Sequence, residues 1–114
     1  MRRGSDNVFL GYLGENFSTT GTFDTGVGYG PLRSNTTGAD NTAMGANNLG
    51  LNTTGAENTA VGVGACLSNT TGTGHTCFGY DSDVVGQNLH NATAIGAHAT
   101  VKVSDAIVLA ALPA

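Results

Sequence analysis

The chain has 114 residues, of which 18 are glycine and none is tryptophan; 11% are charged, and the formal net charge is -4. This length suits one small domain. With only four Lys and Arg residues, the chain lacks the basic surface that binding to nucleic acid or to an anionic membrane requires. Spanning a bilayer takes about 20 consecutive apolar residues, and no stretch of the chain is that long, so direct membrane insertion is not expected. The basic start, Met1-Arg2-Arg3-Gly4, is not followed by the apolar segment of a secretion signal.

A glycine preceded by an apolar residue recurs at a constant spacing along the chain. The six pairs are Leu10-Gly11, Val27-Gly28, Met44-Gly45, Val61-Gly62, Phe78-Gly79 and Ile95-Gly96. A further copy follows at a shorter spacing, at Val108-Leu109-Ala110. This periodicity predicts one repeat domain over residues 1–110, with residues 111–114 as a tail or the start of a stalk.

Each repeat is too short for two helices and their turns, but it can hold two short strands. Thr-Thr-Gly triplets and a glycine in every repeat also disfavour helix. The turn Asn35-Thr36-Thr37-Gly38 combines a side-chain cap with a glycine, and its stacked Asn and Thr side chains are expected to form hydrogen-bonded ladders. We therefore expect an all-β fold, a parallel β-roll (β-solenoid) of about six 17-residue coils.

The strand at residues 59–61 predicts which columns face the interior. Alternation sends Ala60 and Val61 to opposite faces. We expect the large apolar column of Val61 to be buried and to be closed from the opposing strand by Leu32, Leu49 and Cys66. The column of small residues should then face outward, where sister chains could approach closely: it contains Gly26, Ala43, Ala60, Cys77 and Ala94.

The motifs Asn41-Thr42-Ala43-Met44-Gly45 and Asn58-Thr59-Ala60-Val61-Gly62 resemble the head repeats of trimeric autotransporter adhesins, as does the segment 91–96. The segment 7–12 is similar to repeats of phage-type tail fibres and related trimeric fibres. The resemblance implies a left-handed parallel β-roll, a homotrimer, and a non-enzymatic surface-fibre head for adhesion or binding to a glycan or host receptor. It also implies a location at the cell surface, outside the cell or on a virion fibre. The autotransporter repeat is shorter than the repeat of this chain, and we expect neither an anchor barrel nor a long stalk within the chain.

The repeat is broken after Gly79, and breaks are where repeat proteins concentrate specific features. The segment 81–90 replaces the usual Asn-Thr-Thr-Gly turn. This position makes five residues the candidate ligand-binding set: Tyr80, Asp81, Asp83, Gln87 and His90.

No catalytic signature is present, so we expect no enzyme activity. The glycines of Gly26-Val27-Gly28-Tyr29-Gly30 belong to repeat columns and no helix pattern follows, so we expect no nucleotide and no other cofactor. A metal site could in principle be assembled by His75, Cys77, Cys66, His90 and His98. Their spacing is not diagnostic and column substitution explains His75 and Cys77, so no metal is expected.

Three further features leave alternatives open. Cys66 and Cys77 could bridge adjacent coils, although buried thiols acting as small apolar residues are favoured. Glycosylation motifs at Asn16, Asn35, Asn52, Asn69 and Asn91 are interpreted as products of the repeat. The tyrosine column, Tyr12, Tyr29 and Tyr80, could bind sugars or pack in the core or an interface. Two alternative functions also remain, a purely structural fibre spacer and an ice- or mineral-binding solenoid with stacked threonines.

Overall fold

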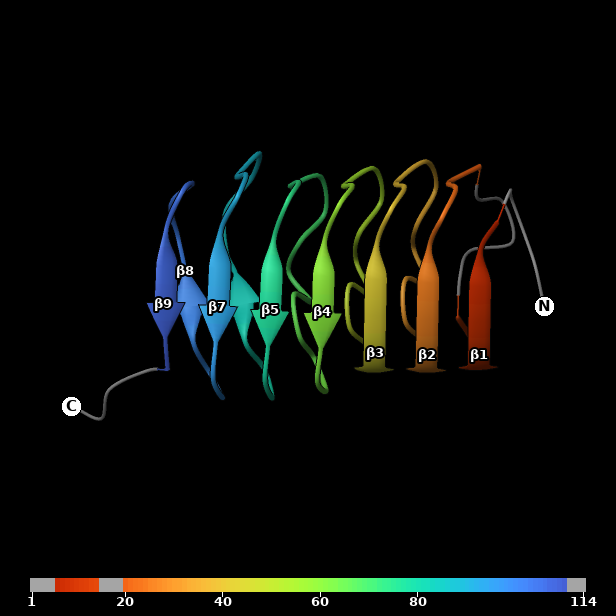
Figure 1. Cartoon of the computed structure of the whole chain (residues 1–114), viewed down its shortest axis with the longest axis horizontal. Helices are drawn as coiled ribbons and strands as arrows, with labels where there is room; N and C mark the ends of the chain where they lie inside the picture. The colour runs from red at the N-terminus through yellow and green to blue at the C-terminus, as the bar shows by residue number, and fades with distance from the viewer. Residues whose placement is uncertain (1–5, 15–19, 111–114) are drawn as a thin grey trace.

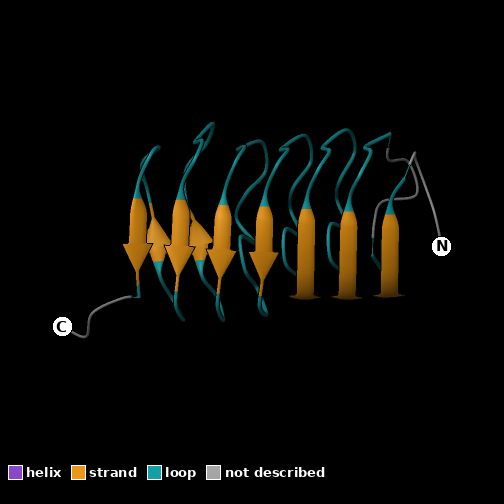
Figure 2. Cartoon of the chain, in the orientation of Figure 1, coloured by secondary structure: helices purple, strands orange, loops and turns teal. Residues whose placement is uncertain are grey.

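The computed structural model describes residues 6–14 and 20–110, and these residues wind into a parallel β-solenoid (Figure 1). The strands are β1 (Val8–Tyr12), β2 (Thr25–Tyr29), β3 (Thr42–Ala46), β4 (Thr59–Val61), β5 (Thr76–Phe78), β6 (Asp83–Val84), β7 (Thr93–Ile95), β8 (Thr100–Val101) and β9 (Ile107–Leu109). No helix occurs among the described residues, and strands alternate with turns throughout (Figure 2). The prediction of an all-β solenoid of about six coils is confirmed.

Seven strands form one parallel sheet in the order β1-β2-β3-β4-β5-β7-β9. The sequence period sets its register, because Gly11 pairs with Gly28 and Gly28 with Gly45, and the members of each pair are one repeat apart. The short last copy also joins this sheet, since Thr93 pairs with Ile107. A second sheet of two strands, β6 and β8, lies behind the first near the C-terminal end (Figure 1).

The repeated glycine is required where coils stack most closely. At Gly28 the backbone has φ 129°, a conformation that L side chains rarely adopt. A Cβ built there would collide with the carbonyl oxygen of Gly45 in the next coil. Any side chain would therefore both strain the backbone and separate two coils.

On the seven-stranded sheet, the column of small residues lines the interior and the column of large apolar residues faces outward. The prediction of which column faces the interior is therefore wrong. Ala43, Ala60 and Cys77 are completely buried, whereas Leu10, Met44 and Phe78 are exposed. The small column faces Leu32, Leu49 and Cys66, which are also completely buried, as expected. The solenoid is too narrow to hold two large apolar side chains at each level, so a leucine on one wall is matched by an alanine on the other.

No helix in the described part of the chain is long and apolar enough to cross a membrane.

Candidate functional site

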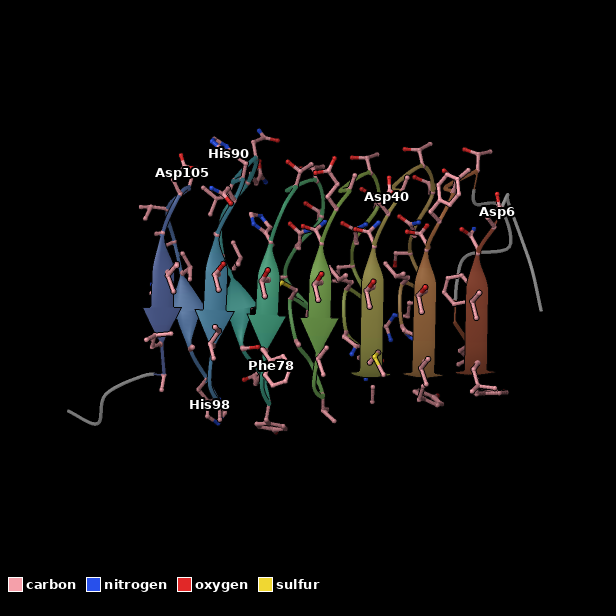
Figure 3. All side chains as sticks on the ribbon, viewed as in Figure 1. Asp6, Asp40, Phe78, His90, His98 and Asp105 are labelled. Carbon is pink, nitrogen blue, oxygen red and sulfur yellow. A yellow bond between two sulfur atoms is a disulfide. The ribbon has the colours of Figure 1, made fainter. Side chains whose placement is uncertain are left out.

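The structure separates the five residues of the predicted ligand set. Tyr80 and Asp81 lie in the turn after β5, and Asp83 begins β6 on the other sheet. Gln87 lies in the next turn, and His90 follows it in an isolated bridge to Thr73. His90 and His98 lie at opposite ends of the strands (Figure 3). The set is therefore not one site.

His98 lies at the lower edge of the molecule as drawn in Figure 3, where it contacts Tyr80 and Asp81 of the preceding coil. The ring of His98 stands edge-on to that of Tyr80, with ring centroids 5.3 Å apart. Its Nδ1 lies 3.2 Å from Oδ2 of Asp81, and both side chains are exposed. We call these three residues the Tyr80 cluster. The sequence analysis considered His98 only as a metal ligand. His98 follows Asp81 by one full repeat in the sequence, and this spacing could have predicted that the two side chains are neighbours.

The backbone holds the Tyr80 cluster at defined positions. The Asp81 amide donates to the carbonyl of Val63 at 2.8 Å, and the His98 amide donates to the carbonyl of Tyr80 at 2.9 Å. Asp81 and His98 both have positive φ, at 54° and 61°, because they occupy the same corner of successive coils. The cluster is thus built on the solenoid framework rather than on a long loop.

Asp83 serves the fold instead of this cluster. Its Oδ1 accepts hydrogen bonds from the amides of Ser68 and Val84, at 3.2 and 2.9 Å. Burial raises the pKa of its carboxyl above the ordinary value, against the lowering effect of these hydrogen bonds. Its role is to connect the strand β6 to the preceding coil.

His90, at the upper edge, pairs with the last coil. Its Nε2 lies 3.4 Å from Oδ2 of Asp105, and its Nδ1 lies 3.2 Å from the hydroxyl of Ser104. The side chain of Gln87 is in an exposed turn. No aromatic ring contact accompanies His90 among the described residues, which distinguishes this histidine from His98.

Polar ladders run through the interior, as the stacked asparagines predicted. In one ladder, each side chain accepts a hydrogen bond from the backbone amide one repeat later; its members are Asn7, Asp24, Asn41, Asn58 and His75. The other ladder links Asn69 to Asn52 and Asn52 to Asn35 through side-chain amides. The two ladders converge on Asp24, whose carboxylate accepts from the side chains of Asn35 and Asn41.

Three of the five glycosylation motifs have their asparagine in the interior. Asn35, Asn52 and Asn69 are buried and hydrogen-bonded, so the folded chain cannot present them to a glycosyltransferase. Asn91 is exposed, and Asn16 lies outside the described residues. The interpretation of these motifs as products of the repeat fits the three buried positions.

Two titratable ladder residues have shifted pKa values that sequence reasoning did not anticipate. Burial raises the pKa of Asp24, while hydrogen bonds from Asn41 and Asn35 oppose the shift. Burial, followed by the charge of nearby His90, lowers the pKa of His75. His75 Nδ1 accepts from the amide of Ala92 at 3.2 Å, and its Nε2 has no hydrogen-bond partner among the described residues. This geometry assigns the neutral form with the proton on Nε2.

Cys66 and Cys77 form a disulfide, which corrects the expectation of two buried thiols. Their Cα atoms are 5.5 Å apart across the interior. The bond removes both thiolates from the residues weighed as metal ligands. Within the described part of the chain, no three His, Cys, Asp or Glu residues gather in a way that could hold a metal ion.

The outward side of the seven-stranded sheet carries the large apolar column. We call this surface the outer sheet face. Its exposed apolar residues are Val8, Leu10, Tyr12, Tyr29, Met44, Phe78, Ile95, Ile107 and Leu109. A threonine column runs beside them in register: Thr25, Thr42, Thr59, Thr76 and Thr93. Such a continuous apolar surface is typical of an interaction site.

Comparison with known protein families, curated proteins and solved structures finds no match to this chain.

Proposed function

We propose that this chain is a non-enzymatic head or tip module of a homotrimeric surface fibre, which attaches to a glycan or host receptor. The supporting observation is the outer sheet face, where Leu10, Phe78 and Leu109 are 69%, 55% and 68% exposed. A single chain leaves this column in water, while the inward side of the same sheet carries small residues such as Ala43 and Ala60. Association of sister chains through the outer sheet face would bury the column, in place of the small-residue face expected from sequence.

The disulfide supports a location outside the cytosol. Such bonds persist in oxidising surroundings, which include the cell surface and extracellular fibres. The fully buried Cys66 and Cys77 are structural partners rather than exposed reactive thiols.

Multi-angle light scattering on the purified chain tests the assembly. We expect a particle of three times the 11.4 kDa chain mass at micromolar concentration. Phe78→Lys should shift the particle toward monomer, because it introduces charge on the outer sheet face. Val103→Lys is the matched control, since Val103 is similarly exposed but lies outside the seven-stranded sheet. A wild-type monomer at this concentration would contradict the proposal.

The register of the threonine column favours a second candidate, binding to ice or a mineral surface. Sequence reasoning placed the repeated Thr-Thr-Gly at turns, but another threonine in each coil lies on the sheet. Protruding Met44 and Phe78 interrupt the flatness that an ice surface requires. Thermal hysteresis in the purified protein would favour this candidate. Its absence would leave the fibre module as the proposed function.

The spacer alternative is distinguished by attachment of the intact fibre. If the module is a spacer with no ligand of its own, substitutions across the segment 81–90 should leave attachment of the intact fibre unchanged.

A further inference from the structure

We infer that the Tyr80 cluster is a binding subsite for a neutral sugar residue. The inference rests on the proposed attachment function and names the ligand class of that function. It begins with Tyr80, which is 58% exposed although it is aromatic. An exposed aromatic ring offers an apolar surface to the C–H groups of a pyranose, and its hydroxyl can form hydrogen bonds.

His98 and Asp81 supply polar groups next to this ring. The contact between His98 Nδ1 and Asp81 Oδ2, at 3.2 Å, fixes the orientation of the imidazole. With the proton on Nδ1, the His98 Nε2 atom is available to accept a hydrogen bond from a hydroxyl. The carboxylate of Asp81 has further acceptor capacity, because an ionised carboxylate has about four lone-pair sites.

The charge of the cluster selects among sugars. A carboxylate on a chain of formal net charge -4 disfavours sulfated or carboxylated glycans and favours neutral ones. A carboxylate accepts hydrogen bonds from neutral hydroxyl groups, so a neutral hexose chain meets the requirements of both the ring and the acceptors.

Two other places on the molecule show what is particular to this cluster. Tyr12 and Tyr29 belong to the same column and lie 5.6 Å apart by ring centroids, but the corner residues beside them are Leu13 and Gly30. His90 and Asp105 form a pair at the upper edge like that of His98 and Asp81, without an aromatic contact of their own in the described ranges. Only the Tyr80 cluster, among the described residues, joins the ring to the acid and imidazole.

The test is saturation-transfer NMR and affinity electrophoresis of the intact chain with three neutral polysaccharides, mannan, galactan and β-glucan, and with heparin as the anionic probe. We expect at least one neutral polymer to bind and heparin not to bind. Tyr80→Ala should weaken binding at least tenfold, and His98→Ala should weaken it severalfold. His90→Ala is the matched control, since His90 pairs with Asp105 in the same way but has no ring contact, and it should leave binding unchanged.

Light scattering on the same variants separates this inference from the proposed assembly. If the Tyr80→Ala variant remains trimeric but no longer binds the polymer, the result supports the sugar subsite. Equal binding by Tyr80→Ala and wild type, binding to heparin alone, or no binding to any of the three neutral polymers would overturn it. A wild-type monomer that binds a neutral polymer through Tyr80 would contradict the assembly and leave the subsite intact.

Discussion

Cys66 and Cys77 are joined across the solenoid interior, 11 residues apart in the chain. The same separation relates Leu49 to Ala60 one coil earlier, and both members of that pair are completely buried. The disulfide therefore occupies the place of a leucine and alanine pair in the repeating core.

The double substitution Cys66→Leu with Cys77→Ala should preserve the fold. Loss of the cross-link costs about 3 kcal/mol in the chain-entropy model, and burial of a leucine restores about 2 kcal/mol. We expect a net loss of about 1 kcal/mol, measured as the urea midpoint at fixed protein concentration. Cys66→Ala with Cys77→Ala is the control and should lose clearly more, since it leaves a cavity. Equal losses in the two variants would show that this coil cannot accept the leucine pair.

Asp24→Asn should stabilise the protein at neutral pH. Burial raises the pKa of Asp24, so the folded state favours the neutral carboxyl and stability falls as pH rises from the unfolded value near 3.8 through the folded pKa. A neutral amide avoids that cost and matches Asn41 and Asn58 in the ladder. We expect a gain of about 1 kcal/mol at pH 7, which is within the usual range for one buried hydrogen-bonding group.

The gain should shrink as both proteins are titrated toward acid, because Asp24 then becomes neutral itself. Asp40→Asn is the control: Asp40 is a nearby carboxylate whose charge contributes to the raised pKa of Asp24. It should have a smaller effect at pH 7. A less stable Asp24→Asn variant would mean that the hydrogen bond from Asn35 to the carboxylate outweighs the burial of charge.

His75 should make the fold sensitive to mild acid. Its folded pKa is lowered, so the stability that it contributes is complete above the unfolded value of 6.5 and is lost as pH falls toward the folded pKa. Protonation would also place an N–H group against the amide of Ala92. Thermal melts between pH 8 and about pH 5 should show a falling transition temperature in this window.

His75→Asn restores the ladder residue found at Asn41 and Asn58 and should flatten this pH dependence. His98→Asn changes an exposed histidine and should leave the slope in place. The hypothesis fails if the slope survives His75→Asn unchanged.

Gly28→Ala should be among the most damaging single substitutions. The added Cβ collides with the Gly45 carbonyl, and φ of 129° adds backbone strain, so we expect a loss of about 3 kcal/mol or more. Gly74→Asn is the control: its φ is 69°, the nearest atom to a new Cβ is 3.6 Å away, and Asn91 occupies the same column with φ 53°. Urea titration should show a change of about 0.5 kcal/mol or less for Gly74→Asn.

The solenoid was predictable because its structural period equals the period of the sequence repeat. Gly28 pairs with Gly45 at the spacing that the repeat shows, and the turn at residues 35–38 is capped by Asn35 as expected. A fixed period leaves little freedom in strand order or register.

The facing of the strands was not predictable from alternation alone. Ala60 and Val61 are both apolar, so the pattern allows either to face inward. The opposing Leu49 decides the question, since a narrow interior that already holds leucine has room only for alanine. This information depends on the width of the coil, which the sequence period does not give.

The candidate site was predicted only in part. Tyr80 and Asp81 lie in the Tyr80 cluster, but Asp83 and His90 contact other parts of the fold. Proximity along the chain was used to group these residues. In a solenoid the relevant neighbour lies one coil away, which is why His98 belongs with Asp81.

The buried ladder asparagines bear on how the protein can be produced. Asn35, Asn52 and Asn69 are hidden once the coils close, yet each is an acceptor motif in the nascent chain. Synthesis in a eukaryotic secretory pathway would expose them to oligosaccharyltransferase before folding. A glycan attached to any of the three would hold its coil open, so bacterial expression with later oxidation is the suitable route to native material.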